Sequence, residues 1–360
     1  MTLSVHLTHR RDDFSLDVSF EAPPGVTVLF GQSGSGKTTV INAVAGLLRP
    51  DNGRISVGDW LLCDTSQGMC LPPHKRRLGY VFQEARLFPH MTVQQNLRYG
   101  QRFAPRNARP EDEARVTEML GIGHLLSRRP SDLSGGEKQR VAIGRALLAS
   151  PKMILADEPL ASLDADRKED ILPYFERLRD ETDIPILYVS HSAAEVARLA
   201  TTVVALHEGR VTRIGSAAEV LSSPDHLPGG VRAAGAVLDA TVRQHHDDGL
   251  TELNAGGEPL FLPRIPQPVG QNVRVRIAAH EVLLSRGRPE GISALNILEG
   301  EITALHSGGG PGMMVTLSTP AGLVPARITK RSAQAMGLNV GDRCTAVIKT
   351  VAIAPIDIGT

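Results

Sequence analysis

A glycine-rich segment near the amino terminus has the residue types and spacing that bind phosphate. Residues 31–38 (GQSGSGKT) match the pattern GxxxxGK(S/T) in full, directly after the apolar run 25–30 and before a helical pattern over 38–48. Glycines let backbone N–H groups curl around phosphate oxygens, and the helix start adds partial positive charge. We predict a nucleotide site with Lys37 on the β- and γ-phosphates and Thr38 on Mg²⁺, formed by Gly31, Gln32, Ser33, Gly34, Ser35, Gly36, Lys37, Thr38 and Thr39.

Two carboxylates follow a second apolar run, residues 153–156. A buried strand that ends in Asp157 and Glu158 is costly unless the charges have a purpose, although such a pair can also be simply solvated. Beside a nucleotide, Asp157 would hold Mg²⁺ through water, and Glu158 would act as general base on the attacking water. A third apolar run, 186–189, leads to His191. Because the carboxyl ends of parallel strands collect ligands, we expect His191 beside the γ-phosphate.

Two adjacent glycines, Gly135 and Gly136, directly precede another predicted helix, over 137–149. Ser134 and Glu137 have the spacing of a capping box, and a helix start with Gly135 and Gly136 is also an anion site. The chain therefore has two phosphate-binding helix starts far apart in the sequence. They can enclose one nucleotide only if two copies of the chain contribute them, so we predict a homodimer with two shared nucleotide sites.

Together these segments resemble the ATPase subunits of ABC transporters, over the first two-thirds of the chain and in the family's order. Residues 133–136 with Gln139 and Arg140 are similar to the family signature, Gln83 to its Q-loop, 162–164 to its D-loop and His191 to its switch histidine. The resemblance implies ATP as the nucleotide and these site residues: catalytic Glu158, His191 and Gln83; Mg²⁺ ligands Thr38, Gln83 and Asp157; and Ser134, Gly135, Gly136 and Asp164 on the nucleotide. The aromatic residue that stacks on adenine is left open between Phe14 and His9, and Phe14 also suits the core.

The same resemblance implies a membrane partner. The apolar loop from Gln83 to Thr92 is the predicted docking surface for a membrane permease, with a packed surface loop as the alternative. The amino terminus has no signal-peptide pattern, and no apolar run approaches the roughly 20 residues that span a bilayer. We expect a peripheral protein on the cytoplasmic face of the inner (plasma) membrane, held there by another chain.

The chain falls into two regions of different character. Alternating apolar runs and helical patterns are typical of an α/β fold, and we predict a P-loop NTPase domain of ABC ATPase type over 1–228. A Pro-, Gly- and Ser-rich stretch at 222–230 indicates a linker. Short strands then predict an all-β module of small OB-like barrels at 229–290 and 291–360, with a weak repeat in which 237–242 resembles 297–302 and 270–277 resembles 341–348.

Residues 293–296, 326–332, 337–341 and 348–350 of the carboxyl-terminal region resemble the small β module that binds molybdate. Residues 80–90 and 158–164 resemble segments of the ATPase of molybdate importers, so the resemblance to that ATPase extends over nearly the whole chain. This implies an importer ATPase that works with a permease and, indirectly, a substrate-binding protein. It also implies a regulatory oxyanion (molybdate) site formed by Ser293, Thr329, Ser332, Lys349 and Thr350. Leu295 stands where the family has Arg, which removes a charge-assisted donor, so a purely structural tail is the alternative. Tungstate, sulfate or another solute is the alternative cargo.

The composition excludes other classes. With 39 basic and 39 acidic residues the formal net charge is zero, which argues against binding nucleic acid. A single phosphate loop and no heptad run argue against the soluble ABC proteins that act on DNA or ribosomes. Three cysteines, Cys63, Cys70 and Cys344, predict neither a disulfide framework nor an oxidising compartment, and Cys63 and Cys70 lack the spacing of zinc ligands.

Overall fold

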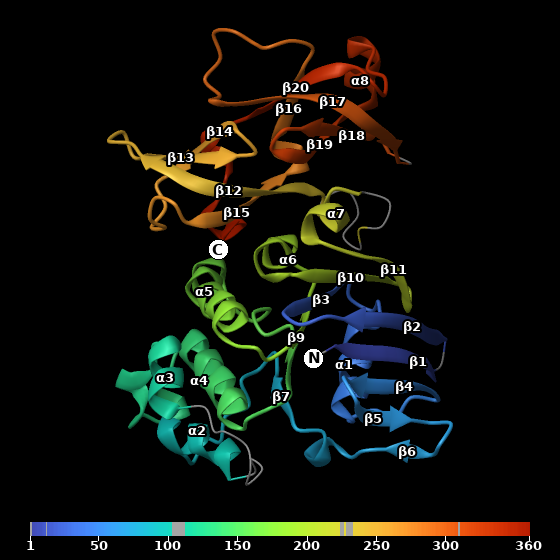
Figure 1. Cartoon of the computed structure of the whole chain (residues 1–360), viewed down its shortest axis with the longest axis vertical. Coiled ribbons are helices and arrows are strands. Elements are labelled where there is room, and N and C mark those ends of the chain that lie inside the picture. Colours follow the sequence, from blue (N-terminus) through green and yellow to red (C-terminus); the bar gives the residue numbers. More distant parts are fainter. Residues whose placement is uncertain (1, 12, 103–111, 224–226, 228–232, 309) are drawn as a thin grey trace. The chain divides into compact units, whose positions relative to one another are not determined.

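The computed structural model describes residues 2–11, 13–102, 112–223, 227, 233–308 and 310–360 (Figure 1). The chain divides into two compact units: a first unit of residues 1–191 and 199–214, and a second unit of residues 192–198 and 215–360. The predicted linker lies largely outside the described residues, and the predicted domain boundaries stay predictions. In the part of the chain that the structure describes, no helix is long and apolar enough to cross a membrane.

A mixed sheet of eleven strands organises the first unit, in the order β6-β5-β4-β1-β2-β11-β10-β3-β9-β8-β7. Neighbouring strands from β10 to β7 in this order are parallel. The three predicted strands are confirmed as β3, β8 and β9, and β3 and β9 are buried along their whole length, as continuous apolar runs in a parallel sheet are. The bounds are β1 Leu3–Arg11, β2 Phe14–Ala22, β3 Val26–Gly31, β4 Asn52–Val57, β5 Trp60–Asp64, β6 Met69–Cys70, β7 Leu78–Val81, β8 Met153–Asp157, β9 Ile186–Ser190, β10 Thr202–His207 and β11 Arg210–Gly215.

The helices begin and end at residues that cap them. α1 starts directly after the glycine-rich loop and ends at Ala45, because Gly46 adopts a left-handed φ of 80° and closes the helix. The helix predicted over 137–149 is confirmed as α4, whose N-cap is Ser134, and the N-cap of α5 is Asp164. The bounds are α1 Lys37–Ala45, α2 Val93–Gln101, α3 Glu113–Met119, α4 Gly135–Leu148, α5 Ala165–Glu181, α6 Ala193–Leu199 and α7 Ala217–Leu221.

The buried guanidinium of Arg76 ties the segment after β6 to the end of α1. The residue is 2% exposed, and its Nη1 atom donates to the carbonyl oxygens of Ala43 (2.7 Å) and Val44 (2.8 Å) in the last turn of α1. Its Nε atom donates to the carbonyl oxygen of Leu71 at 2.7 Å. A cation at this position satisfies carbonyls that a helix end leaves free and interacts favourably with the helix dipole. Arg76 therefore holds the far end of the helix that starts at the nucleotide loop.

A disulfide that the sequence analysis did not predict joins two adjacent strands of the first unit. Cys63 on β5 and Cys70 on β6 face each other in the antiparallel ladder, with their Cα atoms 4.0 Å apart. One cross-strand bridge is not a framework, and Cys344 in the second unit is free and buried. The spacing of seven residues gives no local signal for the pair, because the turn between β5 and β6 brings it together.

Two five-stranded antiparallel sheets build the second unit, which is all-β apart from short helices. The first sheet has the order β14-β13-β12-β15-β21 and the second has the order β19-β18-β17-β20-β16. The strands β14, β13, β12, β15 and β21 of the first sheet thus occupy the same positions as β19, β18, β17, β20 and β16 of the second. The bounds are β12 Gly235–His245, β13 Leu250–Ala255, β14 Glu258–Pro263, β15 Asn272–Ala278, β16 Val282–Ser285, β17 Asn296–Ser307, β18 Gly312–Thr319, β19 Gly322–Thr329, α8 Lys330–Met336, β20 Arg343–Ile348 and β21 Ile358–Gly359.

Backbone hydrogen bonds confirm the predicted repeat. In each sheet, one residue of the central strand exchanges two backbone hydrogen bonds with the turn that precedes a neighbouring strand. The ladder on the other side of the central strand, β12–β13 or β17–β18, shifts its register directly after that residue. The bonds, at 2.8 to 2.9 Å, run from Val242 N to Gln271 O and from Gly270 N to Val242 O in the first sheet, and from Ile302 N to Asp342 O and from Gly341 N to Ile302 O in the second. A shared local irregularity at matching positions is strong evidence for two copies of one unit.

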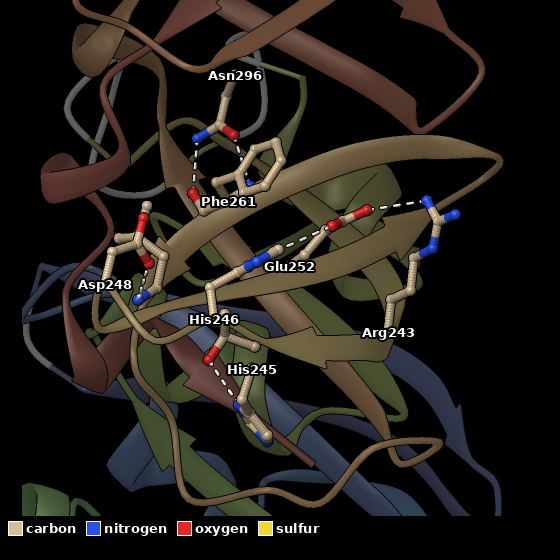
Figure 2. Close-up of polar contacts among 9 residues, drawn as sticks. Arg243, His245, His246, Asp248, Glu252, Phe261 and Asn296 are labelled. Atoms are coloured by element: carbon tan, nitrogen blue, oxygen red, sulfur yellow. Dashed lines mark hydrogen bonds and ion pairs between the residues drawn. The ribbon is translucent and has the colours of Figure 1, made fainter.

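The two repeats exchange their last strands. β16, which follows the first repeat along the chain, pairs with β20 in the second sheet, whereas β21 pairs with β15 in the first. One cluster of buried apolar residues, including Leu238 and Leu298, draws on both sheets. Asn296 on β17 is fully buried, and its amide exchanges hydrogen bonds of 2.6 and 2.8 Å with the backbone of Phe261 on β14 (Figure 2). The repeats therefore share one core.

We expect the change Arg76→Ala to lower the free energy of unfolding by about 3 kcal/mol, because it opens a cavity and leaves buried carbonyl oxygens without a donor. Denaturant unfolding of the purified protein measures this. The exposed Lys75→Ala, one residue earlier, is the control and should change stability by less than about 0.5 kcal/mol. Equal effects of the two changes would show that Arg76 does not hold α1.

Candidate functional site

The loop between β3 and α1 fixes the ammonium of Lys37. The Nζ atom donates to the carbonyl oxygens of Gly31 and Gln32, both at 2.8 Å, and the residue is only 4% exposed. Burial lowers the pKa of Lys37, and the nearby charges of Glu158 and Asp157 oppose that shift. A desolvated cation in a loop of backbone groups is well suited to bind phosphate.

The loop's own residues fit a phosphate group. Gly34 and Gly36 adopt φ values of 82° and 101°, which side chains disfavour, and a Cβ atom on Gly36 would lie 2.7 Å from Leu16. The hydroxyl of Ser35 is buried and has no hydrogen-bond partner. Leaving such a group unsatisfied is costly, and a phosphate oxygen would satisfy it. The loop is therefore shaped for a ligand with acceptor oxygens.

Asp157, at the end of β8, lies in a polar cluster. The hydroxyl of Tyr80 is 3.2 Å from Asp157 Oδ2 and 3.3 Å from Asn42 Oδ1 on α1, and Thr38 also hydrogen-bonds the carboxylate. Burial raises the pKa of Asp157, while the bonds from Tyr80 and Thr38 and the charge of Lys37 oppose the shift. Tyr80 was not predicted as a site residue, and a hydroxyl within an apolar strand was the available signal.

The side-chain oxygens of Asp157 and Thr38 suit Mg²⁺ when a nucleotide is bound beside them. Mg²⁺ prefers carboxylate and hydroxyl oxygens and usually takes its remaining ligands from phosphate and water. Among the described residues, no three His, Cys, Asp or Glu side chains are grouped to hold a metal ion. Asp157 and Thr38 can therefore supply part of a coordination shell that phosphate oxygens would complete.

Glu158 turns back toward Lys37 and His191. Its N–H donates to Val189 O at 3.2 Å, next to the β8–β9 ladder, and its φ of 44° is a left-handed conformation that costs energy for this residue type. Its Oε1 atom is 3.8 Å from Lys37 Nζ, and its Oε2 atom is 3.3 Å from His191 Nδ1. The structure thus brings together the predicted base, the predicted phosphate-binding cation and the predicted switch histidine.

Gln83 lies in the exposed loop after β7, and the backbone of this loop meets two other predicted motifs. Its carbonyl oxygen accepts a hydrogen bond from Ser162 Oγ at 3.5 Å. Gln139 of α4, which is 3% exposed, donates to the carbonyl oxygen of Phe82 at 3.1 Å. The predicted Q-loop, D-loop and signature helix are therefore connected at residues 82–83.

An aromatic groove of about 360 Å³ lies beside this loop. Phe88 contacts Tyr99 with ring centroids 4.4 Å apart, and the guanidinium of Arg145 lies 5.4 Å from the Phe88 ring. Arg86 lies 4.3 Å over the ring of Phe82. The groove combines apolar surface with two cations, and the predicted docking loop contributes Phe88 and Arg86 to it.

The remaining predicted nucleotide contacts make local hydrogen bonds. Ser134 accepts from Glu137 N at 3.3 Å and donates its own N–H to Glu137 Oε2 at 2.7 Å, which completes the predicted capping box. Asp164 accepts from Arg167 N at 3.0 Å at the start of α5. These contacts leave Gly135 and Gly136 at a helix start whose N–H groups carry partial positive charge.

Both candidates for adenine stacking lie on the two amino-terminal strands. Phe14 is partly buried against the core of the first unit, and its ring would be 3.1 Å from a Cβ atom on Gly36. His9 lies 3.5 Å from Asp51 through its Nδ1 atom. Phe14 is thus next to the glycine-rich loop as well as part of the core.

The five predicted oxyanion residues lie in two groups at opposite ends of β17. Ser293, Lys349 and Thr350 are beside its first end, because Asn296 pairs with Ile348. The residues at its other end are Thr329 and Ser332, since Ser307 pairs with Met313 and Gly312 pairs with Thr329. β17 has twelve residues, about 35 Å of extended strand. One chain therefore does not bring the five together.

Each of these two groups still has chemistry suited to an anion. The hydroxyls of Thr329 and Ser332 are 2.8 Å apart, and Ser332 N donates to Thr329 Oγ1 at 3.0 Å. Thr350 Oγ1 is buried and has no hydrogen-bond partner. Leu295, at the position where the resemblance predicts an arginine, is 50% exposed.

Comparisons with known proteins agree with this architecture. The family model described as ABC transporter matches residues 16–161, and the TOBE domain model matches residues 292–355. A nucleotide-free ATP-binding cassette from an ABC transporter has a TM-score of 0.54 and 27% sequence identity, covering 63% of this chain and 97% of that chain.

Several relatives carry the name molybdenum import ATP-binding protein ModC. The one from Mesorhizobium japonicum is 53% identical over 353 residues, 98% of this chain and 95% of the relative. The one from Rhizobium meliloti is 50% identical over 356 residues, 98% of this chain and 99% of the relative. The chain therefore belongs to the ModC family of ABC transporter ATP-binding proteins.

Proposed function

We propose that this protein is the ATPase subunit that powers import of molybdate through a separate membrane permease. The observation that carries the proposal is the identity of about one half, over both units, to relatives named for molybdenum import. The protein works as a homodimer at the cytoplasmic face of the membrane, and a substrate-binding protein delivers the oxyanion to the permease. The geometry around Glu158 supports ATP hydrolysis as the source of energy.

The predicted site residues of the first unit each have a role in this reaction. Lys37 and the backbone of residues 31–39 bind the ATP phosphates. Asp157, Thr38 and Gln83 would hold Mg²⁺, which would neutralise phosphate charge. Glu158 takes a proton from the attacking water. His191, 3.3 Å from Glu158, orients that carboxylate and donates to the γ-phosphate.

A second copy of the chain completes the nucleotide site. The α4 start is a natural anion site, yet the side chain of Ser134 is bound within its own capping box. In the homodimer, Ser134, Gly135 and Gly136 of one copy, together with Asp164, contact the nucleotide held by the loop of the other.

The aromatic groove beside Gln83 is the docking site for the permease. A short amphipathic helix of a membrane subunit would place apolar side chains against Phe82, Phe88 and Tyr99 and acidic ones near Arg86 and Arg145. The loop backbone joins this groove to Ser162 and Gln139, so docking and nucleotide binding are mechanically connected.

The oxyanion residues support a feedback role for the second unit. Because the two groups lie at opposite ends of β17, a molybdate ion would contact both only if one group came from each of two chains. Molybdate held between two tails would then keep the nucleotide units apart and slow hydrolysis.

We expect the change Glu158→Gln to slow ATP hydrolysis by at least ~100-fold, because the amide cannot accept the proton. ATP binding should stay close to wild type, and the ATP-bound dimer should persist. Phosphate release and nucleotide binding measure the two effects. Glu208→Gln, whose side chain is 86% exposed, is the matched control. Normal turnover in the Glu158 variant would rule out its role as base.

The shared site can be tested by mixing two inactive variants, Lys37→Ala and Ser134→Glu. A mixed dimer pairs the intact loop of one chain with the intact α4 start of the other, so one of its two sites is complete. We expect the mixture to regain ATPase activity that neither variant has alone. If each site were built within one chain, mixing would restore nothing.

Molybdate titrated into the ATPase assay of the reconstituted transporter should lower turnover several-fold, and the variants Thr329→Val and Lys349→Ala should each remove the inhibition. Ser318→Ala, an exposed hydroxyl change on β18, is the control. Turnover that is unchanged at saturating molybdate would leave the second unit with a structural role alone.

A further inference from the structure

The cysteine pair of the first unit is arranged for chemistry that nucleotide hydrolysis does not use. Cys63 and Cys70 are directly opposite each other on β5 and β6 and are joined in a disulfide. Their surroundings differ: Cys63 is 0% exposed, whereas Cys70 is partly exposed on β6, the strand at the edge of the sheet. Cys70 is therefore the more exposed residue of the pair, although it also packs partly against the apolar core of the first unit.

The third cysteine has a different environment. Cys344 is buried in the second unit, where its thiol donates to Ser285 O at 3.2 Å. Burial raises the pKa of the Cys344 thiol, which disfavours the reactive thiolate. It is an internal control for reactivity within the same chain.

Short contacts lead from the pair to the nucleotide helix. Leu71, which follows Cys70, donates its N–H to Leu62 O at 2.9 Å, and its own carbonyl oxygen accepts from Arg76 Nε at 2.7 Å. The same guanidinium donates to the last turn of α1, the helix that begins at Lys37. The bridge between β5 and β6 thus closes the segment, residues 62–76, that carries the cap of α1.

We propose that Cys63 and Cys70 are a reversible thiol–disulfide site in which Cys70 is the entry sulfur and Cys63 the resolving one. The co-reactant is a low-molecular-weight disulfide of the glutathione class. The Cys70 thiolate attacks this disulfide, forms a mixed disulfide and releases one small thiolate. The Cys63 thiolate then attacks the Cys70 sulfur, forms the protein disulfide and releases the second small thiolate.

This exchange is balanced, because two protein thiols and one small disulfide become one protein disulfide and two small thiols. Reduction runs the same path backwards: a small thiolate attacks the Cys70 sulfur and releases Cys63. Disulfides of reversible, redox-sensing type are those that occur in reducing compartments. The bridge would make the 62–76 segment, and with it the cap of α1, more rigid when the small disulfide is abundant.

The test is to incubate the full-length protein with oxidised or reduced glutathione and identify its thiols by mass spectrometry after denaturation. With three cysteines in the chain, oxidation of the wild type should leave one free thiol, Cys344, and no retained glutathione. Cys63→Ala should retain one glutathione on Cys70. Cys70→Ala should retain none on Cys63, and Cys344→Ala should still form the bridge.

Three free thiols in the oxidised wild type would overturn the site, and this reading does not depend on any variant. Glutathione on Cys63 in the Cys70→Ala protein would overturn the assigned entry sulfur.

Hydrogen exchange supplies the second measurement: the amide of Leu71 should exchange several-fold more slowly in the oxidised wild type than in the reduced one, with no such difference in Cys70→Ala. Equal exchange in both redox states would overturn the link to the 62–76 segment.

Discussion

The site in the first unit depends on one constraint, the parallel pairing of β3, β9 and β8. Parallel neighbours end at the same edge of a sheet, so the residues that follow them must meet there. Lys37 follows β3, His191 follows β9 and Glu158 follows β8, and the carboxylate of Glu158 lies 3.8 Å from one and 3.3 Å from the other. The left-handed backbone of Glu158 is accepted because the ladder next to it and the buried Lys37 hold it in place.

Much of the fold and the site of the first unit could be predicted, because the sequence signals for them are local. The loop pattern, the capping box of Ser134 and Glu137, and the apolar runs each lie within a few consecutive residues, and all appear in the structure where the sequence indicates them. Tyr80 and Arg76 were not predicted because their partners are distant in the sequence, and the disulfide was not predicted because only the turn between β5 and β6 brings its cysteines together. Tyr80 and Asp157 are 77 residues apart in the sequence, and Arg76 and Ala43 are 33 apart, so the neighbouring residues give no signal for either contact. Long-range partners of single polar side chains depend on the assembled sheet.

The second unit shows the same division between local and global information. The repeat was visible in the sequence because its copies share short segments, and matching hydrogen bonds at Gly270 and Gly341 confirm it. The exchange of β16 and β21 was not visible, since a four-residue and a two-residue strand suit either sheet equally well. The exchange matters for stability: neither sheet is complete without the other repeat, so the shared core and Asn296 make the unit fold as one.

In the proposed dimer each unit would contribute half of a binding site, and this would couple the two ligands. The α4 start makes its contacts within its own capping box, and the oxyanion residues stand at two ends of one strand. If each ligand bridges the same two chains, each must prefer some arrangements of those chains over others. Thermodynamic linkage then requires that the two ligands affect each other's binding equally, with a sign set by whether their preferred arrangements agree. Inhibition by the transported ion follows when the arrangement that holds the oxyanion separates the two nucleotide units.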